Sequence, residues 1–122
     1  MLYLELPQAL GVAQSLGFHV RDRGLLASAL ARPAASMFGE DAYESLELKA
    51  AAMFSSLAQN HALFDGNKRF SWIMTATFLA MNRYKLTMAN DEAFDFVLAV
   101  AQSKLELDEI AAVIAAHVTP TP

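Results

Sequence analysis

The chain has 122 residues, enough for one domain with its own hydrophobic core, and we expect residues 1–122 to form a single domain. Hydrophobic residues make up 55% of it and charged residues 18%, which excludes a disordered or fibrous chain. The net charge of −4, with its nine cations scattered, argues against a nucleic-acid partner, and the absence of cysteine excludes disulfides and thiolate–zinc sites.

The first half of the chain is expected to begin with two short helices. The first runs from Leu6 to Leu16 and ends at Gly17, a residue suited to a helix C-terminus. Asp22 precedes a second apolar run with small residues, which Pro33 ends. Residues 33–41 are then expected to form a loop or a short extended hairpin.

Two longer helices are expected on either side of a polar break at 60–66. Apolar residues at helical spacing predict the first over 43–59, and the second is expected over 67–82. The second is apolar on almost all sides, so it is predicted to lie in the centre of the bundle. We interpret Trp72 within it, and the methionines, as core residues.

Two further helices complete the predicted fold. Asn90 is expected to cap a helix that starts with Asp91 and Glu92, whose negative charges interact favourably with the positive N-terminal end of the helix dipole. Asp108 is expected to cap the last helix, and the terminal TPTP is expected to fray. The predicted buried residues of these two helices are Phe94, Val97, Leu98 and Ala101, then Ile110, Val113 and Ile114. The whole pattern predicts an all-α bundle of five or six helices. No run approaches the roughly 20 apolar residues of a membrane helix, and the N-terminus has no signal-peptide pattern, so we expect a cytoplasmic protein with no membrane partner.

The nine residues from His61 to Arg69, HALFDGNKR, concentrate the candidate chemistry at the start of the 67–82 helix. The first turn of a helix presents unpaired N–H groups that bind anions, and Gly66 before it allows a ligand close to the backbone. Asn67, Lys68 and Arg69 crowd this same end. Cations are unfavourable there on dipole grounds, so a bound anion such as phosphate would remove the penalty.

Two further side chains of the segment suit reactions of phosphate esters. Asp65 is a single carboxylate of the kind that binds Mg²⁺ together with phosphates and water. His61, at the end of the preceding helix, has a pKa suited to removing a hydroxyl proton near neutral pH. Together they point to phosphoryl or nucleotidyl transfer. Alone, each is ordinary, since Asp-Gly-Asn is a common turn and Lys-Arg a common surface pair. His19 and His117 have no such neighbours and are predicted to be structural or surface residues.

The segment resembles the H-x-F-x-D-[AG]-N-K-R signature of the Doc branch of the Fic family. RDRGLLASALARP and FGEDAY upstream resemble the family's second helix and active-site flap, and FLAMNRYKL and LELDEIAAVIAAHV also match its pattern. The resemblance covers most of the chain from about Val20 onward, while the first helix matches poorly. It implies a Fic-fold helical bundle with a short flap before the active-site loop.

The resemblance also implies a function. Doc proteins are toxins of toxin–antitoxin pairs and are neutralised by a partner such as Phd. They move the γ-phosphate of ATP to a threonine of elongation factor Tu, which inhibits translation. By position, His61 would be the general base, Asp65 the Mg²⁺ ligand, and Gly66, Asn67, Lys68 and Arg69 the residues that bind the phosphates.

Lys68 decides between two activities of the family. Members that transfer AMP have glycine at this position and commonly a second arginine where this chain has Trp72, so the sequence favours a protein kinase. Leu63 replaces the usual Phe and Ala62 a frequent Pro; the smaller leucine predicts a more loosely packed loop. AMP transfer and a catalytically silent, partner-binding bundle remain as alternatives. No R-x-x-x-x-H pair of a small helical ribonuclease toxin and no self-inhibition motif is present.

Overall fold

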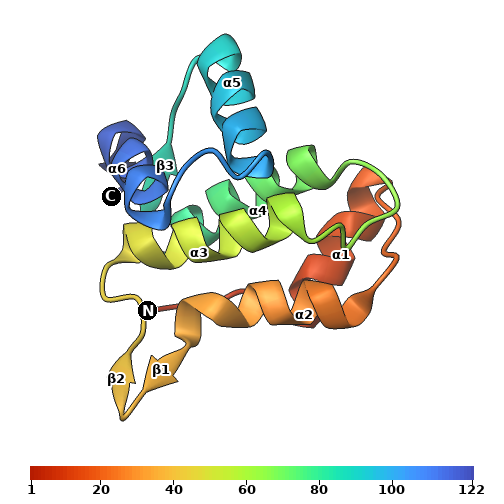
Figure 1. Ribbon diagram of the computed structural model, residues 1–122, viewed down its shortest axis with the longest axis horizontal. Coiled ribbons are helices and arrows are strands. Elements are labelled where there is room, and N and C mark those ends of the chain that lie inside the picture. The colour runs from red at the N-terminus through yellow and green to blue at the C-terminus, as the bar shows by residue number, and fades with distance from the viewer.

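The computed structural model describes residues 1–122 as six α-helices and two small antiparallel sheets (Figure 1). The helices are α1 (Leu6–Leu16), α2 (Arg23–Ala31), α3 (Leu46–Gln59), α4 (Asn67–Met81), α5 (Asn90–Ala101) and α6 (Leu107–His117), and a 3₁₀ turn (Arg32–Ala34) follows α2. The strands pair as β1 (Ser36–Met37) with β2 (Glu40–Asp41) and β3 (Tyr84–Leu86) with β4 (Val118–Pro120). The predicted all-α bundle is confirmed. None of the helices has the length and apolar character required to cross a lipid bilayer.

The central helix of the bundle is α3, which packs against α2, α4, α5 and α6. Its alanines 50–52 are completely buried, and such small side chains let neighbouring helices approach from several sides. The prediction that the 67–82 helix is central is therefore only partly correct. One face of α4 is buried, through Phe70, Ser71, Met74, Thr75, Phe78 and Leu79, while its other face is half-buried or exposed.

Several helix ends differ from the predictions because a different residue caps the helix. The hydroxyl of Ser45 accepts a hydrogen bond from the N–H of Leu48, so α3 starts at Leu46 rather than at Tyr43. Ala89, not Asn90, is the N-cap of α5. Glu106 caps α6 in a reciprocal capping box, two residues before the predicted Asp108. The predicted ends at Gly17, with φ of +80°, and Asp22, whose side chain accepts from Leu25, are confirmed.

Two predictions for the C-terminal third are wrong. The predicted buried stripe of α5 included Phe94, but this ring is 68% exposed; Val97 is buried as predicted, and Phe96 and Val100 face the core beside it. The two stripes are offset by less than one helical turn, so apolar spacing alone does not separate them. The terminal TPTP does not fray along its whole length, because Val118–Pro120 pairs with the strand that follows α4.

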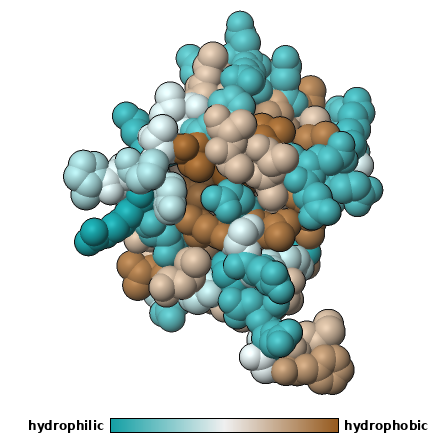
Figure 2. Space-filling view, turned by 90° about the vertical axis from the view of Figure 1, so that its left-hand side faces the viewer, coloured by the Kyte–Doolittle hydropathy of each residue, from teal (hydrophilic) through white to brown (hydrophobic).

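The predicted hairpin is present, but it lies at the opposite end of α3 from the HALFDGNKR segment (Figure 1). Lys49, buried to 2% exposure, holds it by donating to the carbonyl of Pro33 and the carboxylate of Asp41, both at 3.1 Å. The tip projects from the body with Met37 and Phe38 exposed (Figure 2). The hairpin therefore does not border the candidate site, contrary to the implied active-site flap.

Candidate functional site

The HALFDGNKR segment forms the loop between α3 and α4 and the first turn of α4, and we call its part from His61 to Gly66 the motif loop. His61 lies just beyond the preceding helix, since α3 stops at Gln59, the end predicted from the sequence. Its side chain is exposed and its backbone is left-handed, with φ of +55°. A left-handed conformation costs a residue with a Cβ atom free energy, so other contacts must hold it.

A short segment before α2 runs antiparallel to the motif loop and braces it. Val20 and Leu63 form an antiparallel bridge, and the N–H of Phe64 donates to the carbonyl of His19 at 3.0 Å. The N–H groups of Arg21 and Asp22 both donate to the carbonyl of Ala62, at 2.8 and 3.0 Å. The loop is thus fixed by residues about 40 positions earlier in the chain.

The side chain of Arg21 holds His61 directly. Its Nε and Nη2 atoms donate to the carbonyl oxygen of His61 at 2.9 and 2.6 Å. This fork of two charge-assisted hydrogen bonds fixes the peptide that carries the imidazole. This role could not be predicted from the sequence, because no local pattern relates an arginine before α2 to a loop after α3.

Asn67 braces the same loop from the other side. Its Oδ1 accepts from the N–H of Leu63 at 2.9 Å, and its Nδ2 donates to the carbonyl of Leu63 at 3.0 Å. In this structure the amide side chain is thus engaged by the loop, so contact with a phosphate would fall to the N–H groups of the first turn. Leu63 and Ala62 are both 1% exposed, so the more loosely packed loop predicted for leucine is not observed.

Gly66 is required by both conformation and space. Its φ of +81° lies in the left-handed region, and a Cβ atom there would be 2.5 Å from the ring of Phe18. Phe18 cannot easily move, since it packs edge-on against Phe70 at 5.4 Å and under the guanidinium of Arg69 at 5.8 Å. The start of α4 is therefore a rigid platform.

A cavity of about 380 Å³, the motif cavity, opens at this platform between α3, α4 and α5. Its lining residues are Ala58, His61, Phe64, Asp65, Gly66, Asn67, Lys68, Leu98, Ala101 and Gln102. Oδ1 of Asp65 accepts from the N–H of Gly66 at 2.9 Å. No cluster of three or more His, Asp or Glu side chains could hold a metal, so Asp65 could bind Mg²⁺ only together with ligands from a substrate or water.

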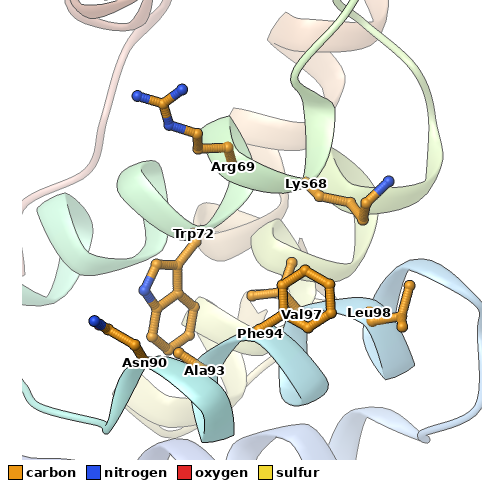
Figure 3. Close-up of a pocket in the computed structure, with 8 residues that line it drawn as sticks. All are labelled: Lys68, Arg69, Trp72, Asn90, Ala93, Phe94, Val97 and Leu98. Atoms are coloured by element: carbon orange, nitrogen blue, oxygen red, sulfur yellow. The ribbon is translucent and has the colours of Figure 1, made fainter.

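The structure brings five of the six predicted site residues to this cavity, and Arg69 is the exception. Arg69 lines a smaller cavity of about 260 Å³ on the other face of the Asp65–Gly66 turn. It also lines a third, mostly apolar cavity of about 400 Å³ between α4 and α5, which we call the apolar pocket. Trp72, predicted to be core, is only half-buried because it forms a wall of this pocket (Figure 3).

The other two histidines lie outside the motif cavity, as predicted. His19 is exposed. His117 is half-buried, with Nδ1 2.7 Å from the carbonyl of Val113 and Nε2 3.2 Å from the carboxylate of Glu92. The hydrogen bond to Val113, followed by the charge of Glu92, raises the pKa of His117 above its ordinary value. This histidine joins α6 to α5.

Comparisons with known proteins identify the family of the chain. A family described as Fic/DOC matches residues 2–79, so the match includes α1, which we expected to match poorly, and ends within α4. Toxin Doc of Mycolicibacterium smegmatis is 50% identical over 98 residues, which cover 79% of this chain and 75% of that protein. The chain therefore belongs to the Fic/DOC family, in the branch that contains Toxin Doc.

Proposed function

We propose that this protein is the toxin of a toxin–antitoxin pair and a protein kinase that transfers the γ-phosphate of ATP to a threonine of elongation factor Tu. The similarity to a protein named Toxin Doc supports the toxin assignment, and the family supports a transferase. A Phd-like antitoxin is the proposed partner. The threonine target and the inhibition of translation follow from the resemblance of the motif to Doc proteins.

Lys68 is the observation that carries the choice of γ-phosphate over AMP transfer. It is the second residue of α4, is exposed, and lines both the motif cavity and the apolar pocket. A glycine here would leave the backbone N–H groups open to a nucleotide phosphate, whereas a lysine side chain occupies part of that space with a positive charge. A nucleotide that crosses from one cavity to the other must pass this charge.

The residues of the motif cavity have complementary roles in the proposed transfer. His61 accepts the proton of the threonine hydroxyl, whose oxygen bonds to the γ-phosphorus while the bond from that phosphorus to the bridging oxygen breaks and ADP leaves. Lys68 and the N–H groups of the first turn of α4 bind the phosphate oxygens. Asp65 would hold Mg²⁺, which neutralises charge on the phosphates when bound.

Arg21 prepares His61 for this role without touching the substrate. Its two hydrogen bonds to the His61 carbonyl hold the peptide in the left-handed conformation. The backbone that carries the imidazole is therefore fixed in the loop. Because a general base must lie within hydrogen-bond reach of the proton it removes, such positioning contributes to the rate.

The experiment is a transfer assay with purified elongation factor Tu and ATP labelled on either the α- or the γ-phosphate. We expect label only from the γ-phosphate, no label with His61→Ala, and normal labelling with the matched control His117→Gln, which lies outside both cavities. Label from the α-phosphate would establish AMP transfer instead. No label from either position, with a folded protein, would favour the silent partner-binding bundle.

A further inference from the structure

Phe64 is the one side chain of the motif loop that is large, apolar and exposed. Its ring is 71% exposed, whereas the neighbouring Leu63 is 1% exposed. The bridge between Val20 and Leu63 keeps this stretch extended, and successive side chains of an extended chain point to opposite faces. Burial of Leu63 therefore turns Phe64 toward solvent. Single exposed apolar residues are common, so the meaning of Phe64 depends on what surrounds it.

Two further cavities lie next to Phe64, where the C-terminal end of α1 approaches the motif loop (Figure 1). One is the cavity of about 260 Å³ that Arg69 also lines, and the other has a volume of about 480 Å³. The residues that line both are Gly17, Phe18, His19 and Phe64. The two cavities therefore form one groove between α1 and the motif loop, which we call the α1 groove.

The α1 groove has apolar walls and a preformed base. Leu16, which is 52% exposed, lines its smaller cavity together with Phe64, so two of the seven exposed large apolar side chains border one small space. The apolar residues that line the larger cavity besides Phe64 are Leu10, Ala13, Phe18 and Val20. Phe18 is fixed by its packing against Phe70 and Arg69. Such a groove binds an apolar side chain with little loss of its own conformational freedom.

The α1 groove is continuous with the motif cavity, because Phe64 lines both. The motif cavity thus adjoins the apolar pocket at Lys68 and the α1 groove at Phe64. In phosphoryl transfer the attacking and leaving oxygens lie roughly in line, on opposite sides of the phosphorus. Because the proposed nucleotide lies on the Lys68 side, the acceptor hydroxyl must arrive from the other side. That side is bordered by Phe64, three residues after the proposed base His61.

We infer that the α1 groove binds the segment of the target protein that carries the acceptor threonine, and that Phe64 contributes to specificity by packing against a bulky apolar side chain of that segment. This inference rests on the proposed function, because it assumes that a threonine hydroxyl reacts in the motif cavity. Covering the exposed ring supplies binding free energy for the protein substrate. That contribution does not depend on the nucleotide, so Phe64 recognises the target protein and not ATP.

Steady-state kinetics of γ-phosphate transfer to purified elongation factor Tu test this role. Phe64→Ala is expected to raise the KM for elongation factor Tu about tenfold and to leave kcat and the KM for ATP unchanged, because the contact is equally strong in the ground and transition states. Phe64→Leu, which keeps a bulky apolar side chain, should retain most of the affinity, and Leu16→Ala should also raise this KM. The control is Leu2→Ala, which should change neither constant. Leu2 is 59% exposed and is hydrogen-bonded to Asn82 at the far end of α4.

An unchanged KM for elongation factor Tu in Phe64→Ala, or an equal rise in the KM for ATP, would overturn the inference and leave the proposed function intact, since transfer would still occur. Absence of γ-phosphate transfer by the native protein would remove the proposed function, and the inference with it. Analytical ultracentrifugation tests the other occupant, a second copy of this chain. Self-association that Phe64→Ala abolishes, with the KM for elongation factor Tu unchanged, would assign the α1 groove to that copy and overturn the inference.

Discussion

Replacing Gly66 by alanine is expected to destabilise the protein by about 2–5 kcal/mol, as the sum of two effects. The left-handed φ of +81° costs a residue with a Cβ atom about 1–2 kcal/mol. The new methyl group would lie 2.5 Å from the ring of Phe18, and such overpacking costs about 1–3 kcal/mol more. The phenyl ring cannot escape cheaply, because Phe70 and Arg69 pack against it.

Gly17 provides the matched control for this change. It has nearly the same φ, +80°, but a Cβ atom there would meet nothing within 4 Å. Gly17→Ala should therefore cost only about 1–2 kcal/mol. Urea unfolding of the two variants measures the difference, and a double variant with Phe18→Leu should recover part of the loss in Gly66→Ala. Equal destabilisation by the two alanines would refute the collision with Phe18.

Two other predictions concern the hydrogen bonds of Arg21 to the motif loop and of His117 to Glu92. Arg21→Lys, which loses the two-pronged contact to the His61 carbonyl, should lower the rate of phosphate transfer about tenfold, while Arg23→Lys should leave it unchanged; equal rates in the two variants would remove the positioning role. His117 has a raised pKa, so its contribution to stability is complete below the unfolded-state pKa of about 6.5 and is lost as the pH rises through the folded-state value. The difference in urea midpoint between the native protein and His117→Gln should therefore be larger at pH 5.5 than at pH 8.5, and Glu92→Gln should reduce that dependence. A difference independent of pH would contradict the assignment.

Helix existence could be predicted from the sequence more reliably than helix ends and faces. Gly17 and Asp22 are used as their residue types predict. Glu106 was missed because glutamate is an uncommon N-cap. Here its side chain accepts from the N–H of Glu109, while its own N–H donates to the carboxylate of Glu109. The prediction that Phe94 is buried was wrong because two overlapping apolar stripes fit α5. Only the positions of α3 and α4 decide which of the two stripes faces the core.

The residue types of the candidate site could be predicted from the sequence. The distant residues that hold the motif loop, and the neighbouring apolar pocket, could not. Five predicted residues, His61 and those from Asp65 to Lys68, line one cavity because they are neighbours in sequence at a helix start. Arg21 is 40 residues away from the loop that it holds. The apolar pocket depends on the distance between α4 and α5. The pattern of apolar residues within either helix does not predict that distance.

The bridge between Val20 and Leu63 affects how the motif loop unfolds. Its hydrogen bonds join the α1–α2 connection to the motif loop, whereas α3 and α4 pack against each other directly. Opening of the N-terminal helices would therefore release His61 while the α3–α4 core stays folded. In native-state hydrogen exchange, the amides of Phe64, Arg21 and Asp22 should share one opening free energy below that of the core. Activity would then be lost at a lower temperature than the one at which the α3–α4 core unfolds.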